Sequence, residues 1–270
     1  MGRVRRRTMK SVDVWTDEPG PVGLFGWQCS PIYNLYSRGL QAAPTAIAAT
    51  ASWTRLSLTA DSNPIPAEYA PAYRYLGADL AVLVDEPADN FGFSDGGWVR
   101  IDAELLILPA EERAAGYLNW LHHVMVRLAR FRGWDEEPLR HAYQYCLDHD
   151  LTARFDSPRR RSPDRRHTAT LTLHIDPDGI RHLIITVLDR TGTVVSSEEG
   201  LLRPFFADHH EWGTLSSRFR WTSDISLATE SGVVAFSMSL PGAPRPVTHA
   251  TLRMPVRGFK DDADPSPPTS

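Results

Sequence analysis

The clearest pattern in the chain is a helical repeat of apolar residues between Pro109 and Asp150. In its first half the apolar residues recur at three- and four-residue steps, which places them on one face of a helix: Ala114, Leu118, Leu121, Met125 and Leu128. Gly133 suits the end of this helix, and Asp135 suits the N-cap of a second one. The second helix has its own apolar stripe: Leu139, Ala142, Tyr143, Cys146 and Leu147. The pattern therefore predicts a two-helix hairpin over about 109–150.

On both sides of this hairpin the apolar residues alternate with polar ones or form short apolar runs, as in strands. The predicted strands cover residues 22–27, 53–58, 78–85, 98–108, 168–175, 180–189, 194–195, 219–221 and 233–240. Asp176-Pro-Asp-Gly179 is a good hairpin connection, because glycine adopts positive φ at little cost. The order of elements predicts an α+β fold, with antiparallel sheets, the two-helix hairpin packed on one face, and a C-terminal antiparallel meander.

The domain organisation follows from where apolar residues are scarce. Residues 1–12 are basic and 258–270 are rich in Asp, Pro and Ser, so both ends are predicted to be disordered. Residues 13–257 are predicted to form a single α+β domain, with a sub-boundary in the Arg- and Pro-rich linker at 155–167. Either Met1 or Met9 fits as the natural start.

Composition narrows the class of protein. Hydrophobic residues make up 42% and charged residues 23% of the chain, and no apolar run approaches the roughly 20 residues that a membrane span requires. The basic N-terminus is not followed by the apolar stretch of an export signal. The two cysteines, Cys29 and Cys146, cannot form a disulfide framework. We therefore expect a cytoplasmic protein without a membrane segment.

Lysine is almost absent. Of 29 basic residues only Lys10 and Lys260 are lysines, a bias typical of a high-GC bacterial genome. P-loop NTPases, protein kinases and pyridoxal-phosphate enzymes need a lysine held by the fold. Both lysines lie in predicted tails, so the sequence argues against these classes. No cofactor is predicted, with a divalent metal ion left open.

One candidate for catalysis is Ser94, in Gly92-Phe-Ser-Asp-Gly96, which matches the G-x-S-x-G elbow of serine hydrolases. That elbow lies between a buried strand and a helix. Here a strand is predicted to follow, which favours a connecting loop instead.

The densest set of possible metal ligands is Asp208-His209-His210-Glu211. Imidazole and carboxylate suit zinc, manganese or iron, but adjacent residues rarely converge on one ion. A further ligand from His122, His123, His141 or His149 would be needed, and an exposed polar turn is the simpler interpretation.

Two features suggest binding to another macromolecule. Arginines cluster in the linker at Arg159, Arg160, Arg161, Arg165 and Arg166. The net charge of −4 and the absence of aromatic residues from this stretch argue against nucleic acid. Trp98 and Trp212, near predicted surface loops, could anchor an interface with a protein.

The leading hypothesis is a binding or accessory module without covalent chemistry, hence not an enzyme. It would engage a protein partner through a sheet face, Trp98, Trp212 and the loop at 86–97. The alternative is a metal-assisted or serine hydrolase that uses Asp208, His209, His210 and Glu211, or Ser94.

Overall fold

A computed structural model shows two compact units. It describes residues 7–16, 20–49, 52–59, 71, 73–84, 96–202, 209–224, 226–230, 234–240 and 251–252. The first unit spans residues 1–156, 172–184 and 201–210, and the second spans 157–171, 185–200 and 211–270. The boundary after Asp156 lies in the stretch where the sequence predicts a sub-boundary. No helix in the described part of the chain combines the length and apolar character needed to cross a membrane.

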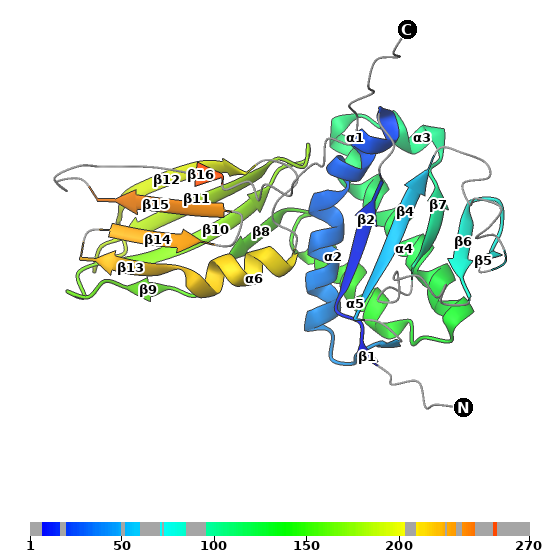
Figure 1. The fold of residues 1–270 in the computed structure, drawn as a ribbon, viewed down its shortest axis with the longest axis horizontal. Coiled ribbons are helices and arrows are strands. Elements are labelled where there is room, and N and C mark those ends of the chain that lie inside the picture. Colours follow the sequence, from blue (N-terminus) through cyan, green and yellow to red (C-terminus); the bar gives the residue numbers. More distant parts are fainter. Residues whose placement is uncertain are drawn as a thin grey trace, which may run out of the picture. The chain divides into compact units, whose positions relative to one another are not determined.

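The first unit is built on a mixed five-stranded sheet (Figure 1). Its strand order is β2 (Ser11–Trp15), β4 (Trp53–Thr59), β7 (Gly97–Arg100), β6 (Leu80–Leu83) and β5 (Tyr73–Tyr75). β2, β4 and β7 are parallel, whereas β6 and β5 are antiparallel to their neighbours. A second, two-stranded sheet pairs β1 (Arg7–Thr8) with β3 (Ala48–Ala49). β1 and the start of β2 lie within residues 1–12, which were predicted to be disordered. These strands form because they pair with β3 and β4, about 40 residues further along the chain.

The predicted strand at 22–27 is wrong. The segment forms α1 (Pro21–Gln28), followed by α2 (Ser30–Ala42), and the two helices connect parallel strands β2 and β4. Pro21 occupies the first turn, where its missing N–H is not needed, and Val22 and Phe25 bury one side. A short apolar run does not distinguish a strand from a buried helix, so the pattern was ambiguous here.

The predicted helical hairpin is confirmed as α4 (Ala110–Arg132) and α5 (Glu137–Asp148). Leu118, Leu121, Met125 and Leu128 are at most 1% exposed, and Gly133 ends α4 with φ 67°. Asp135 lies one residue before the N-cap, yet its Oδ1 accepts the Glu137 N–H at 3.0 Å. In Figure 1 α4 and α5 lie behind the strands of the mixed sheet, and α2 contacts both α5 and β2. Leu147 is 41% exposed, so the α5 stripe is narrower than predicted.

The predicted strand at 98–108 is correct only in its first residues. β7 ends at Arg100, and α3 (Ala103–Leu106) follows. Asp102 caps α3, because its Oδ1 accepts the Glu104 N–H at 3.4 Å. Ile107, near the end of the predicted strand, is 81% exposed. The capping aspartate overrides the alternation of apolar residues.

A buried polar network joins α2 to the hairpin. The Tyr36 hydroxyl donates to the Leu139 carbonyl at 3.2 Å, so the His122 Nδ1–H must donate to Tyr36 Oη at 3.0 Å. Burial lowers the pKa of His122. Arg140 and His123 act in the same direction, whereas Glu136 opposes them.

This lowered pKa predicts an acid-sensitive contribution to stability. Below about pH 6.5 the unfolded chain binds a proton at His122, whereas the folded chain keeps the ring neutral. The contribution of His122 to the free energy of unfolding should therefore fall as the pH drops from 6.5 toward the lowered pKa of the folded state, and it should not change with pH above this range. Urea unfolding of wild type and His122→Gln at pH 7.5, 6.5 and 5.5 measures the effect, because the variant should lose less stability on acidification. Equal pH dependence of both proteins would contradict the prediction.

The predicted C-terminal strands are confirmed as antiparallel sheets. One has the order β12 (Val194–Leu202), β11 (Arg181–Leu188), β10 (Thr168–Ile175) and β8 (Ala153–Asp156), with β9 (Arg160–Arg161) also paired to β10. The other has the order β13 (Arg220–Ser223), β14 (Ser226–Glu230), β15 (Val234–Ser239) and β16 (Thr251–Leu252). Strands β10 and β11 contribute residues to both units. The helix α6 (His209–Arg218), which precedes β13, was not predicted.

Candidate partner-binding face

The structure brings together only part of the residues predicted to carry chemistry. Ser94 and Asp208 lie outside the described residues, as does most of the predicted interface loop at 86–97. His209, His210 and Glu211 begin the helix α6, where the sequence predicted an exposed turn. Within the described residues nothing bears on the hydrolase alternative, which stays a prediction.

Of the four histidines proposed as further metal ligands, three serve local contacts, and His123 is exposed at the polar groove described below. His141 Nδ1 lies 3.0 Å from the Gly39 carbonyl oxygen and His149 Nδ1 lies 2.8 Å from the Tyr145 carbonyl oxygen, while His122 contacts Tyr36. In the part of the chain that the structure describes, no group of three His, Cys, Asp or Glu side chains is placed to hold a metal ion.

Trp98 lies in the middle of a row of aromatic residues that crosses the mixed sheet. The strand registers align Trp15 with Ser57, Ser57 with Trp98, Trp98 with Ala81, and Ala81 with Tyr75. Trp15 is 42% exposed, Tyr75 is 46% exposed, and Trp98 is half-buried. Because paired residues point to the same face of a sheet, the three rings share one face. We call Trp15, Trp98 and Tyr75 the aromatic row.

The aromatic row lies on the face opposite the core. Val12, Val14, Leu56, Leu58 and Val99 are at most 5% exposed and alternate with the residues that carry or flank the row. On β5, Arg74 points the other way from Tyr75, and its guanidinium lies 5.7 Å from the ring centre of Phe131 on α4. The row is therefore turned away from the helix α4.

The next row along the sheet holds a single charge pair. Arg55 Nε donates to Asp13 Oδ2 at 3.1 Å, and the strand register places these two residues opposite each other. The Arg55 guanidinium also lies 5.4 Å from the ring centre of Trp15 and 4.8 Å from that of Trp53. Arg55 is thus held between two indoles, and its charge is neutralised by Asp13.

Two glycines before Trp98 allow the strands under this face to approach closely. A Cβ on Gly96 would clash with the Arg55 carbonyl oxygen, and one on Gly97 would clash with the Ala81 carbonyl oxygen. Only glycine avoids these clashes, so the Gly-Gly-Trp sequence has a structural reason.

A polar groove begins where β7 ends. It has a volume of about 920 Å³ and is lined by Ala78, Asp79, Arg100, Ile101, Asp102, Glu104, Leu105, Leu108, Gly116, Asn119, Trp120 and His123. Asp79 is the carboxylate of this groove that is tied most closely to the fold. Arg127 holds its carboxylate through two hydrogen bonds of 2.5 and 2.9 Å, which lower the pKa of Asp79. Arg127 also donates to the Leu76 carbonyl oxygen, so the ion pair fixes the chain before β6.

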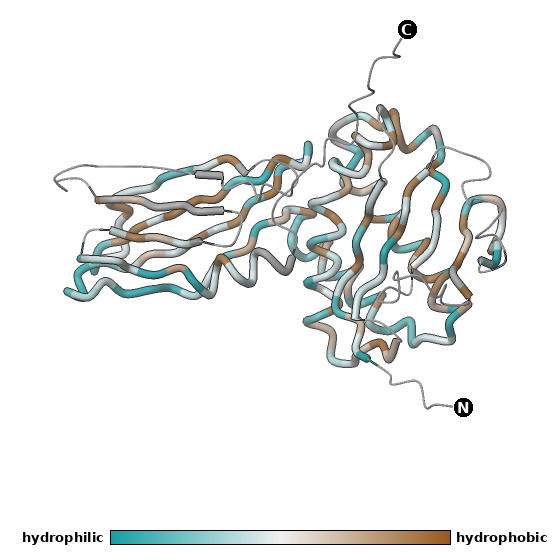
Figure 2. Tube along the Cα trace, viewed as in Figure 1, coloured by the Kyte–Doolittle hydropathy of each residue, from teal (hydrophilic) through white to brown (hydrophobic). Residues whose placement is uncertain are grey.

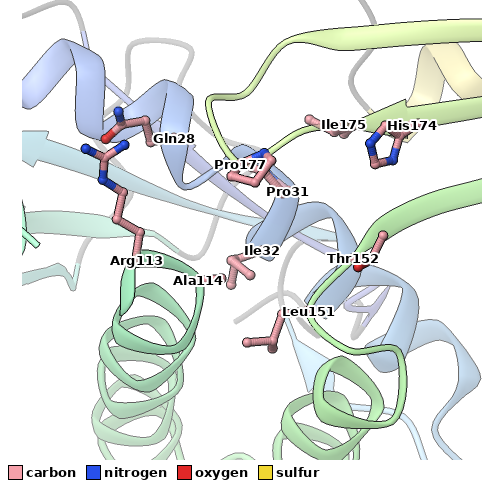
Figure 3. A pocket seen from close by; sticks show the side chains of 10 residues that line it. All are labelled: Gln28, Pro31, Ile32, Arg113, Ala114, Leu151, Thr152, His174, Ile175 and Pro177. Carbon is pink, nitrogen blue, oxygen red and sulfur yellow. The ribbon is translucent and has the colours of Figure 1, made fainter. Parts of the chain in front are cut away.

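A second, smaller cavity is shown in Figure 3. Its volume is about 70 Å³, which holds a few water molecules but not a metabolite. Its polar groups are engaged in the fold. Tyr117 donates to Gln28 Oε1 at 3.1 Å, while Arg113 donates to the Leu108 carbonyl oxygen and pairs with Asp178.

The remaining predicted interface residues have different environments. Trp212 is 2% exposed, so its indole is part of the core rather than the surface. Arg159 and Arg161 are exposed and Arg160 is half-buried. Trp15 was not selected from the sequence. The segment Ser11-Val-Asp-Val-Trp15 offered a signal for it, because alternating valines predict a strand with Trp15 on the face opposite the valines.

Comparison with known proteins gives no assignment. The chain matches no protein-family model, and no curated protein or solved structure matches it significantly.

Proposed function

We propose that this chain is a protein-binding module, and that its partner docks on the open face of the mixed sheet. The aromatic row is the observation that carries this proposal. Three large rings, two of them more than 40% exposed, are presented by strands of one sheet. Tryptophan, tyrosine and arginine are the residue types that dominate binding energy at protein interfaces.

The charge of this face defines the chemistry of the partner. Beside the row, Arg55 and Asp13 neutralise each other, and the positions between the rings are Ser57 and Ala81. The exposed Arg100, two residues after Trp98 on β7, lies beyond the row at the polar groove. A partner with a charged patch would leave that charge unpaired on docking, at a cost in desolvation. We therefore propose a partner that presents an uncharged, apolar protein surface, with side chains that enter the spaces between Trp15, Trp98 and Tyr75.

Site-specific photo-crosslinking tests this assignment. With p-benzoylphenylalanine at Tyr75, cells that naturally produce the chain should yield one crosslinked protein. The same group at Ile107, which is 81% exposed and lies after α3, should not yield it. An adduct shared by both positions, or none at all, would contradict the proposal. An adduct with a second copy of the chain would contradict a foreign partner and would show that this face mediates self-association.

The purified complex allows the row itself to be measured. Trp98→Ala should weaken binding by at least about 2 kcal/mol, or about 30-fold, because a central aromatic anchor is lost. Trp15→Ala provides a second variant, since its ring lies on the edge strand β2. Titration calorimetry measures both affinities, and a circular dichroism melt verifies that each variant is folded. A folded Trp98→Ala variant with wild-type affinity would contradict the role of the row.

We also propose the cytoplasm as the compartment. Cys29 and Cys146 are both free and buried, and burial raises the pKa of each thiol, that of Cys146 to about 12. Free thiols are typical of proteins kept in a reducing environment.

A further inference from the structure

The arginine cluster of the second unit is folded into a turn. Residues 159–167, which we call the arginine turn, carry Arg159, Arg160, Arg161, Arg165 and Arg166. β9 pairs Arg160 with Ala169 and Arg161 with Thr168. In Figure 2 the end of the unit around β9 and β13 is strongly hydrophilic.

Hydrogen bonds close this turn. Ser162 Oγ donates to Asp164 Oδ1 at 2.6 Å, and the same carboxylate oxygen accepts the Arg166 N–H at 2.9 Å. The His167 N–H donates to Ser162 Oγ at 3.0 Å, and Arg165 adopts φ 60°. A non-glycine residue in this region keeps its conformation only where its surroundings hold it. The backbone that carries the arginines is therefore held in one conformation by the turn itself.

The positive charge of the turn is largely uncompensated. Asp164 is 3.7 Å from Arg166, and its pKa is lowered by its bond to Ser162 and by the Arg166 N–H. Within the described residues no carboxylate forms an ion pair with Arg159, Arg161 or Arg165. Arg190 adds a further guanidinium, because its Nε donates to the Arg165 carbonyl oxygen at 3.3 Å.

The fold also supplies the aromatic rings that the stretch itself lacks. The Trp221 Nε1–H, from β13, donates to the Arg160 carbonyl oxygen at 2.9 Å. The His167 ring faces Trp221 with a centroid distance of 6.3 Å and 30° between the planes. A half-buried indole thus lies directly beside the arginines.

We propose that the arginine turn, with Arg190 and Trp221, binds single-stranded nucleic acid. Guanidinium groups pair with phosphate oxygens through two parallel hydrogen bonds, and they also stack on bases. A basic surface with an adjacent aromatic platform is the usual arrangement for binding single strands. Since the whole chain has a net charge of −4, this attraction is local to the turn.

Fluorescence anisotropy with labelled U20 RNA and dT20 DNA tests the proposal. The full chain should bind at 50 mM NaCl and lose affinity as salt rises. Each phosphate contact contributes a slope of about −0.7 in log K against log salt. Arg159→Ser/Arg161→Ser/Arg190→Ser should reduce the magnitude of this slope by about 2 and weaken binding at least tenfold at 100 mM NaCl. Arg130→Ser/Arg140→Ser/Arg154→Ser changes the net charge equally at exposed arginines elsewhere, and it should bind as wild type.

A second variant keeps the test informative if the triple variant does not fold. Trp221→Leu retains every arginine, and it should weaken binding to U20 or dT20 by about fivefold or more. Absent binding by wild type at 50 mM NaCl, or equal losses in both triple variants, would overturn the proposal. Wild-type affinity in a folded Trp221→Leu variant, together with equal competition by heparin, would show a general polyanion site and would also overturn it.

Discussion

Leu121→Ala should destabilise the first unit by about 3 kcal/mol, because it opens a cavity at the centre of the helical hairpin. Leu121 is 0% exposed and lies on the buried face of α4 with Leu118 and Met125. The loss combines the transfer free energy of the missing side-chain atoms with the cost of the cavity. Urea unfolding followed by circular dichroism should show a lower midpoint with an unchanged slope.

Leu147→Ala is the matched control for this substitution. Leu147 lies on the other helix of the same hairpin and is 41% exposed. Its replacement should change the free energy of unfolding by about 0.5 kcal/mol or less. Equal effects at the two positions would mean that α4 does not bury its predicted face.

Gly39→Ala should also destabilise the protein, by about 2 kcal/mol, although alanine is the better helix former. A Cβ at this position in α2 would lie 2.6 Å from the Ala142 Cα and 2.9 Å from the Tyr145 Cβ of α5. These atoms belong to a helix backbone and its first side-chain carbon, so they cannot rotate away. The two helices must separate, which also strains the contact between His141 Nδ1 and the Gly39 carbonyl oxygen.

Gly213→Ala is the control that measures the effect of helix propensity without a close contact. Gly213 lies inside α6, and a Cβ there meets no atom within 4 Å. That variant should be as stable as wild type or more stable by up to about 1 kcal/mol. Differential scanning calorimetry of both variants measures the contrast. If Gly39→Ala gains stability as Gly213→Ala does, the tight packing of α2 on α5 is incorrect.

The first unit shows how far local patterns reach. The hairpin at α4 and α5 was predictable, because its apolar residues repeat at the helical period over 30 residues and more. The strand at 53–58 was also predicted, from a weaker pattern, but the parallel pairing of β2 with β4 was not. α1 was misread as a strand, and so the crossover that places β2 beside β4 was missed.

The candidate site shows the same division. Trp98 was selected from the sequence as an interface residue, and the structure places it between Trp15 and Tyr75. Trp15 and Tyr75 are 60 positions apart in the sequence, and Tyr75 and Trp98 are 23 positions apart. No local signal joins residues at such separations, because strand order is decided by which edges pair. Trp212 was selected on the same grounds, but unlike the half-buried Trp98 its side chain is buried in the core.

By itself the sequence determined the α+β class, the helical hairpin and the C-terminal meander. Each of these depends on spacing within a short segment. Only the tertiary structure decided that an aromatic row crosses the sheet and that Trp221 lies against the arginine turn. The physical reason is that both surfaces are assembled by backbone hydrogen bonds and packing between distant segments, which the local hydrophobic period does not encode.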